Sequence, residues 1–389
     1  MPIKIEWAER LKGLPPYLFV EIDKRKKAKI QDGKDVIDLG IGDPDQPTPD
    51  FIIGSLYHAA RNPKNHGYPS NTGLSSFREA IAKWYKERFG VVLNPDNEIL
   101  PLIGSKEGIA HIPLAFINPG DAALVPDPCY PPYKSGTIFA GGTPHLMPLR
   151  ADNGFLPDFK GIDPQTANKA VLMFLNYPNN PTSAVAGEGF YNSVVEFAAK
   201  NNIIVCHDAA YSEIYYSNQK PRSFLQAKGA KEVGVEFHSL SKTYNMTGWR
   251  VGFVCGNSQI IAALGKVKAN IDSGVFNVLQ LAGVTALTSP DKIYDKIRNM
   301  YEERRDTLVD GLKAIGWNIN KPEATFYVWA AVPNKSTSGE FVALLLDKAD
   351  IVATPGVGFG ENGEGYVRMA LTVGSDRLKE AVTRIGKVL

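Results

Sequence analysis

The segment from residue 238 to 254, HSLSKTYNMTGWRVGFV, holds the side chains of this sequence that are best suited to chemistry. Its single lysine is Lys242. Ser239 and Ser241 precede that lysine, and Arg250 follows eight residues after it. An ammonium group removed from water loses its proton readily, and the neutral amine forms Schiff bases with aldehydes. Two hydroxyls and a guanidinium suit a phosphate dianion. The segment therefore predicts a reactive amine beside a phosphate site, although a solvated loop lysine is the alternative for this segment alone.

A second candidate, Asp208, follows the apolar run IIVC and His207. A carboxylate at the end of a buried strand needs a partner, because burying it unpaired is costly. A protonated pyridine nitrogen would be such a partner, and holding that proton makes the ring an electron sink. Tyr211, three residues later, could reach a phenolic oxygen on the same ring. The alternative is that Asp208 caps a helix.

Three further segments follow apolar runs. In NYPNNPT, Asn180 precedes a proline that fixes the turn and aims the amide. In GSKEG, Ser105 and Lys106 open a helix whose free N–H groups could bind phosphate, although the P-loop spacing is absent. Tyr130, in DPCYPPY, could stack on a pyridine ring. The alternative is an ordinary turn for Asn180, an ordinary helix start for Ser105 and Lys106, and core packing for Tyr130.

Arg368 lies inside the apolar run YVRMAL, where an inward arginine requires an anion. A guanidinium fits a carboxylate in bidentate fashion, so a substrate partner would be an amino acid. A structural salt bridge is the alternative. In VIDLGIGDPDQPTP, Gly40 and Gly42 would let the backbone approach a ligand closely, or are simple turn glycines.

Seven short apolar runs alternate with helical segments from Glu98 onward. This alternation predicts a mostly parallel seven-stranded sheet with helices on both faces, whose ligands collect beyond the carboxyl ends of the strands. The runs are EILPLIG, AALVPDP, GTPHLMPL, AVLMFLNYP, NIIVCHDAAY, EFHSLSK and WRVGFVCG.

The length of 389 residues favours two domains. A long amphipathic helix from 289 to 315 should lead into the smaller one. We expect an N-terminal arm and part of a small α+β domain in 1–48, a large domain in 49–288, and the rest of the small domain in 289–389. Within the large domain, Ser76 and Glu79 predict a capping box at the start of a helix.

The totals argue against several classes of protein. A net charge of +2 gives no reason to expect nucleic acid or a membrane surface as partner. Three widely spaced cysteines without a C-x-x-C pair disfavour a disulfide framework or a metal site. The segment MPIKIEWAERL lacks the apolar core of a secretion signal, so none is expected, and no apolar run approaches the roughly 20 residues that span a bilayer. The expectation is a soluble cytoplasmic protein.

Five motifs in this order, GSKEG, NYPNNPT, HDAAY, SLSKTYNMTGWRVGF and YVRMALT, resemble the class I/II aminotransferases of fold type I. The resemblance implies that Lys242 forms a Schiff base with pyridoxal 5′-phosphate and that Asp208 pairs with its pyridine nitrogen. It implies that Tyr211 and Asn180 bind the ring oxygen, while Tyr130 stacks on the ring. The implied phosphate ligands are Ser105, Lys106, Ser239, Ser241 and Arg250.

The resemblance also implies how the substrate is held. Arg368 would clamp the α-carboxylate, and Lys106, Tyr130 and Asn180 would touch the substrate too. Members of the family are homodimers with sites at the interface. There, the other subunit would contribute the residues Tyr68 and Asn277.

Within this family, LPPYLFVEIDK, LGIGDPDQPTP and LPLIGSKEGIAH are similar to LL-diaminopimelate aminotransferases, which act in lysine biosynthesis. That similarity implies that Tyr17 and Gly42 also touch substrate. Related enzymes often carry a glutamate in the loop that here reads PSNT, residues 69 to 72. Asn71 and Thr72 offer no charge to a distal ammonium group.

The implied reaction is ping-pong transamination with 2-oxoglutarate as the second substrate. The freed lysine would move the Cα proton, so one amine would serve as nucleophile and base. The alternatives are a broad-range alanine or aspartate aminotransferase, a β-lyase, and a non-catalytic regulator on the same fold.

Overall fold

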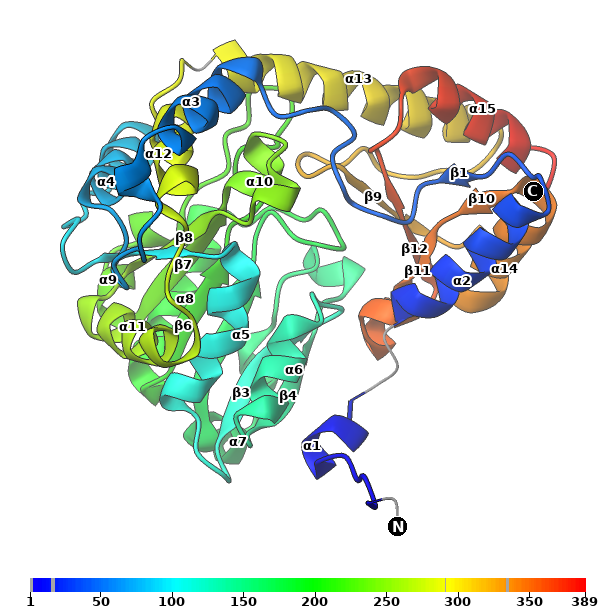
Figure 1. The fold of residues 1–389 in the computed structure, drawn as a ribbon. Coiled ribbons are helices and arrows are strands. Elements are labelled where there is room, and N and C mark those ends of the chain that lie inside the picture. Colours follow the sequence, from blue (N-terminus) through cyan, green and yellow to red (C-terminus); the bar gives the residue numbers. More distant parts are fainter. Residues whose placement is uncertain (1–2, 15–17, 291, 334–335) are drawn as a thin grey trace.

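A seven-stranded sheet forms the centre of the larger part of the molecule in the computed structural model, which describes residues 3–14, 18–290, 292–333 and 336–389 (Figure 1). The strand order is β2-β8-β7-β6-β5-β3-β4. Strand β8 runs antiparallel to β2 and β7, and the other neighbours pair in parallel. Each predicted apolar run forms one strand, so the mostly parallel sheet is confirmed. The strands are β2 (Ile99–Leu102), β3 (Ala122–Asp127), β4 (Thr143–Pro148), β5 (Ala170–Asn176), β6 (Ile204–Asp208), β7 (Gly234–Ser239) and β8 (Gly252–Gly256).

Helices bury both faces of this sheet. Because side chains alternate along a strand, Leu172 and Phe174 of β5 belong to the core on one face. Met173 and Leu175 belong to the core on the other. This double burial explains why a central strand such as β5 is a nearly continuous apolar run. One face is covered by α5 (Ser105–Phe116), α6 (Pro132–Phe139) and α11 (Ser258–Ile271), and the other by α4 (Ser75–Phe89), α8 (Glu188–Asn201) and α12 (Asn277–Leu287).

The start of α4 differs from the prediction. The helix begins at Ser75, its N-cap is Leu74, and no side chain caps it. The capping box of Ser76 and Glu79 is therefore wrong. The Leu74 N–H donates instead to the side-chain oxygen of Gln280, 2.7 Å away on α12, so a tertiary contact satisfies this helix start.

A smaller unit combines segments from both ends of the chain (Figure 1). Strand β1 (Ile37–Asp38) pairs in parallel with β10 (Ile351–Val352). An antiparallel sheet has the order β11-β12-β9. This α+β unit is the predicted one, whereas the boundaries at 48 and 288 stay a prediction. Its other elements are β9 (Tyr327–Ala331), β11 (Thr354–Pro355), β12 (Tyr366–Ala370), α2 (Leu18–Gln31), α13 (Lys292–Ala314), α14 (Ser338–Ala349) and α15 (Ser375–Ile385).

Five further α-helices complete the described ranges. They are α1 (Glu9–Lys12), α3 (Asp50–Ala60), α7 (Pro164–Lys169), α9 (Ala230–Val233) and α10 (Leu240–Thr243).

None of the helices in the described ranges is both long and apolar enough to cross a membrane. The cysteines are buried and form no disulfide, as Cys129, Cys206 and Cys255 are all free thiols.

Candidate active site

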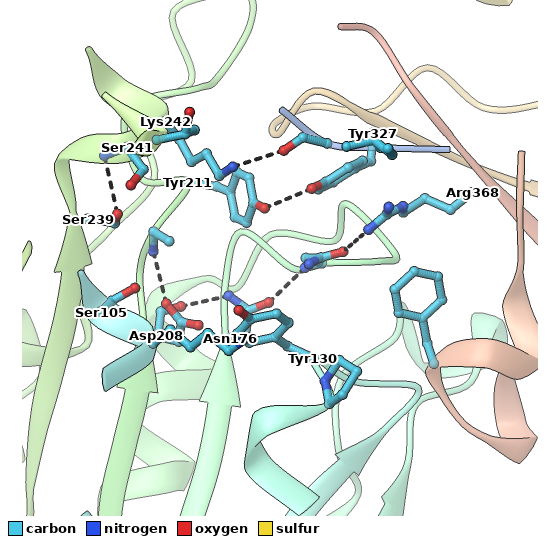
Figure 2. Close-up of a pocket in the computed structure, with 18 of the residues that line it drawn as sticks. Ser105, Tyr130, Asn176, Asp208, Tyr211, Ser239, Ser241, Lys242, Tyr327 and Arg368 are labelled. Carbon is cyan, nitrogen blue, oxygen red and sulfur yellow. Dashed lines mark hydrogen bonds between the residues drawn. The ribbon is translucent and has the colours of Figure 1, made fainter. Parts of the chain in front are cut away.

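A pocket of about 390 Å³ opens at the carboxyl ends of the parallel strands, where the large sheet faces the smaller unit (Figure 2). Most of the predicted site residues line it. Ile41, Asn176, Tyr327 and Phe359 line it as well, although the sequence did not single them out. The predicted residues in the pocket are Gly42, Ser105, Lys106, Tyr130, Asn180, Asp208, Tyr211, Ser239, Ser241, Lys242, Arg250 and Arg368.

Lys242 lies on the short helix α10, directly after β7, and its amine points into the pocket. Ser239 caps this helix by accepting a hydrogen bond of 3.2 Å from the N–H of Ser241. Lys242 Nζ donates to the carbonyl oxygen of Gly42 at 2.9 Å. Burial lowers the lysine pKa to about 8, helped by the charge of Arg368 and opposed by that of Asp43. The amine is therefore much nearer to its neutral, nucleophilic form than an exposed lysine.

Asp208 ends β6 and is almost fully buried, with 5 % of its surface exposed. The hydroxyl of Tyr133 donates to Oδ2 at 2.8 Å, and the N–H of Ala210 donates to Oδ1 at 3.3 Å. Burial raises the carboxyl pKa, and these two hydrogen bonds only partly oppose the effect. Within the described ranges no lysine, arginine or histidine forms an ion pair with Asp208. A buried carboxylate that lines a cavity in this way fits a cationic ligand group, such as a pyridinium.

Donors for an anion gather where α5 begins. Gly104, the N-cap, has φ +71°, and a Cβ there would lie 2.4 Å from Nη2 of Arg250. A Cβ at Gly252 would lie 2.8 Å from the backbone nitrogen of Ser105. The Oγ atom of Ser241 is buried and has no hydrogen-bond partner among the described residues. The start of α5 at Ser105, the guanidinium of Arg250 and the unsatisfied buried hydroxyl of Ser241 together fit a phosphate dianion.

Arg368 occupies the opposite end of the pocket, on β12. Its Nη1 donates to Oδ1 of Asn180 and its Nη2 to the carbonyl oxygen of Gly40, both at 2.8 Å. The guanidinium carbon lies 4.1 Å from the ring centroid of Tyr327 and 4.7 Å from that of Phe359. Both of these hydrogen-bond acceptors are neutral, and a guanidinium held in this way suits a carboxylate in bidentate fashion.

Tyr327 contacts three of the predicted residues, although it was not itself predicted from its segment TFYVWAAV. Its hydroxyl lies 2.9 Å from that of Tyr211, and its ring packs against Arg368. A Cβ at Gly42 would lie only 1.9 Å from the Tyr327 hydroxyl oxygen, so only glycine fits there. The one signal in the sequence was a tyrosine in a buried strand, because its hydroxyl needs a partner.

Asn176, the last residue of β5, organises the loop that carries Asn180. Its side-chain nitrogen donates to the carbonyl oxygen of Asp208 at 2.7 Å, and its side-chain oxygen accepts from the N–H of Asn180 at 2.7 Å. These bonds link the ends of two neighbouring strands to one loop.

The other predicted residues that the structure describes do not line this pocket. The side chain of Tyr68 is 91 % exposed in the loop before α4. Asn277 begins α12, and its Oδ1 atom is buried without a hydrogen-bond partner among the described residues. In the loop 69–72, the hydroxyls of Ser70 and Thr72 bond each other at 2.9 Å. Tyr17 lies outside the described residues.

A family profile, curated relatives and solved structures all match nearly the whole of this chain. The family profile described as "Aminotransferase class I and II" matches residues 34–385. An LL-diaminopimelate aminotransferase of Moorella thermoacetica is 54 % identical over 382 residues, which is 98 % of each chain. One from Syntrophobacter fumaroxidans is 57 % identical over 381 residues, again 98 % of each. The substrate-bound BacF structure from Bacillus subtilis is 43 % identical and superimposes with a TM-score of 0.95 over 99 % of this chain and 98 % of that one.

Proposed function

Because this chain belongs to the class I and II aminotransferases, we propose that it is a pyridoxal 5′-phosphate-dependent LL-diaminopimelate:2-oxoglutarate aminotransferase. In lysine biosynthesis such an enzyme works from tetrahydrodipicolinate towards LL-diaminopimelate. The relatives that bear this name cover nearly the whole chain and support the substrate. The observation that carries the proposal is that the largely buried amine of Lys242 and the buried carboxylate of Asp208 line the same pocket.

The buried carboxylate of Asp208 and the unsatisfied hydroxyl of Ser241 support a fit to the cofactor's pyridine nitrogen and its phosphate. When bound, the cofactor supplies an electron-poor ring that accepts the electron pair of a substrate bond. Asp208 would hold the proton on the pyridine nitrogen, because the charged pair offsets the cost of its burial. Tyr130 would stack on the ring, and Tyr211 and Asn180 would donate to its oxygen. The phosphate would be held by Ser105, Lys106, Ser239, Ser241 and Arg250.

Lys242 has two tasks in this proposal. With a pKa of about 8, its Nζ is available as a neutral amine near physiological pH, both to bind the aldehyde and to take the Cα proton of the amino acid. The carbonyl of Gly42, 2.9 Å from Nζ, gives the amine a fixed resting position.

Arg368 selects the amino acid by its α-carboxylate. The guanidinium is already fixed by Asn180 and Gly40 and packed between Tyr327 and Phe359. Little side-chain entropy is therefore lost when a carboxylate binds to it. The backbone at Gly42 would border the same substrate.

We further infer that two copies of the chain complete each other's sites. The exposed side chain of Tyr68 and the unsatisfied Oδ1 of Asn277 support this, since neither residue lines the pocket of its own chain. In such a homodimer, Tyr68 would reach the cofactor and Asn277 the substrate. The neutral loop 69–72 would lie at the distal end of the substrate.

The test combines cofactor binding with a panel of amino donors. We expect the purified protein to bind pyridoxal 5′-phosphate at Lys242 as a borohydride-reducible yellow adduct, and Lys242→Ala to lose turnover. We expect transamination with 2-oxoglutarate to be faster with LL-diaminopimelate than with alanine or aspartate. A faster reaction with alanine or aspartate would instead establish a broad-range enzyme, which the uncharged loop 69–72 favours. Absence of the adduct would refute the mechanism as a whole.

A further inference from the structure

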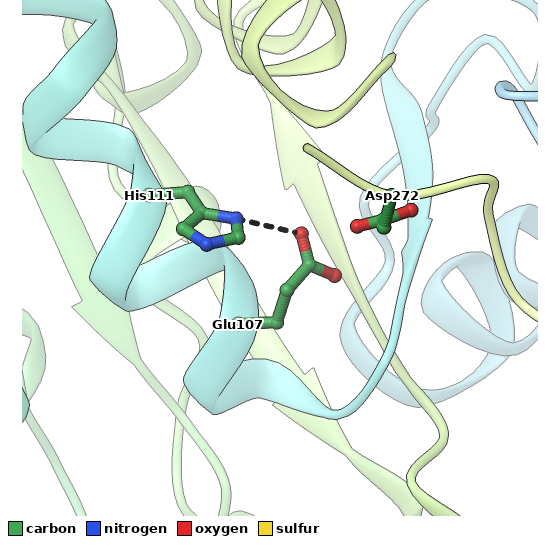
Figure 3. A group of neighbouring side chains, drawn as sticks. All are labelled: Glu107, His111 and Asp272. Carbon is green, nitrogen blue, oxygen red and sulfur yellow. Dashed lines mark hydrogen bonds and ion pairs between the residues drawn. The ribbon is translucent and has the colours of Figure 1, made fainter. Parts of the chain in front are cut away.

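Glu107, His111 and Asp272 form a compact cluster between α5 and the end of α11 (Figure 3). Their potential ligand atoms lie within 4.8 Å of one another, as in a metal site. However, Nζ of Lys268 lies 3.0 Å from Oε2 of Glu107 and 2.9 Å from both carboxylate oxygens of Asp272. The lysine is 1 % exposed. The cation between these carboxylates is therefore the chain's own ammonium group.

Glu107 ties this ammonium to the first turn of α5. It is the third residue of the helix, and its Oε2 also accepts a hydrogen bond of 2.9 Å from the N–H of Ile103. The pKa of Glu107 lies below its usual value. Burial raises this pKa, but the hydrogen bond with His111 and the charge of Lys268 outweigh burial and lower it. The ionised carboxylate thus holds the chain on both sides of Gly104, immediately beside Ser105.

Asp272 ties the same ammonium to a different part of the molecule. Its Oδ1 accepts a hydrogen bond of 2.7 Å from the N–H of Gly274. Gly274 packs against the loop before α4, since a Cβ there would lie 3.0 Å from the carbonyl oxygen of Ser70. Lys268 therefore braces the start of α5 against the segment 272–274 and the loop behind it.

We propose that Lys268 is a positioning residue that holds the first turn of α5 in place to receive the cofactor's phosphate, an inference that rests on the proposed function. A buried ammonium is stable only with its carboxylate partners, and its removal leaves two partly buried carboxylates facing each other. The turn would then shift, and with it Ser105 and Lys106. Nothing in the transamination chemistry needs Lys268 itself.

The test compares the binding of pyridoxal 5′-phosphate with that of pyridoxal, which lacks the phosphate, by absorbance titration. In Lys268→Met, the Kd of pyridoxal 5′-phosphate should rise at least about ten-fold, because displacements near 1 Å cost about that much or more. The Kd of pyridoxal should change less than about two-fold. Lys266→Met, an exposed lysine on the same helix, is the matched control and should bind both compounds as the unaltered protein does.

A second variant separates positioning from charge and decides the question if Lys268→Met does not fold. Asp272→Ala removes a negative charge near the phosphate, so a purely electrostatic effect would tighten the binding of pyridoxal 5′-phosphate. Loss of the brace should weaken it. Tighter binding in Asp272→Ala, or an equal loss of both compounds in Lys268→Met, overturns the proposal while leaving the proposed function intact. Failure of the unaltered protein to bind pyridoxal 5′-phosphate overturns both.

Discussion

Replacement of Gly42 by alanine should impair catalysis strongly without unfolding the protein. The new Cβ would lie 1.9 Å from the hydroxyl oxygen of Tyr327 and 2.6 Å from two of its ring carbons. Carbon and oxygen atoms in close contact are about 3.3 Å apart, so the glycine or the tyrosine must move by more than about 1 Å. Either movement disturbs a contact of 2.9 Å: Lys242 Nζ to the Gly42 carbonyl, or Tyr327 to Tyr211.

The magnitude follows from that displacement. A misplacement of about 1 Å costs roughly 100-fold in rate, or about 2.7 kcal/mol in transition-state free energy. Overpacking should lower the free energy of unfolding by about 1–3 kcal/mol, which is small enough for the protein to stay folded.

The assay is steady-state kcat/KM for transfer from LL-diaminopimelate to 2-oxoglutarate, together with urea unfolding. Gly54→Ala in α3 is the control, because a Cβ there meets no atom within 4 Å. That variant should keep full activity and gain up to about 1 kcal/mol in stability, as alanine is the better helix former. A Gly42→Ala enzyme that retains kcat/KM within about three-fold would refute the steric argument.

Three further outcomes are expected. In the cofactor-free protein, labelling of Lys242 by an amine-specific reagent should rise with a midpoint near pH 8, and a midpoint near 10.5 would show that burial does not lower the pKa. Between pH 8 and 10.5 the lysine binds a proton in the unfolded protein but not in the folded one, so this group makes the free energy of unfolding rise with pH in that window. Lys242→Met should remove this rise in urea unfolding experiments. Arg368→Lys keeps the charge but loses the two-pronged contact with Asn180 and Gly40, so KM for the amino donor should rise at least about ten-fold, and an unchanged KM would exclude the carboxylate role. Asp208→Asn should lower kcat at least about 100-fold, because breaking a buried charged pair costs about 3–5 kcal/mol, and a kcat within ten-fold of the unaltered enzyme would contradict the proposed pairing.

The strands were predictable because their burial on both faces leaves a local mark. A parallel strand buried on both faces is largely apolar and ends in a turn, as β5 does before Asn176 and β6 before His207 and Asp208. Residues that follow such strands collect at one edge of the sheet. That rule predicts that Asn180, Asp208 and Lys242 lie together, and all three line the pocket.

The parts that the sequence did not predict depend on contacts between distant segments. Tyr327 matters because its hydroxyl meets Tyr211 and because Gly42 leaves room for it, and neither relation has a local pattern. The start of α4 likewise depends on Gln280, far along the chain, whereas the local capping pattern at Ser76 was misleading.

The positions along the chain of the large sheet and of the smaller unit have a consequence for synthesis on the ribosome. All seven strands of the large sheet lie between Ile99 and Gly256, so that sheet can assemble while later residues are still being added. The smaller core joins Ile37 and Leu39 to residues as late as Ile385, so it must wait until almost the whole polypeptide has emerged. Arg368 arrives in that final portion. If the proposed function holds, a nascent chain would thus acquire the residues proposed to face the cofactor early, and Arg368, proposed to bind the substrate carboxylate, would be added last.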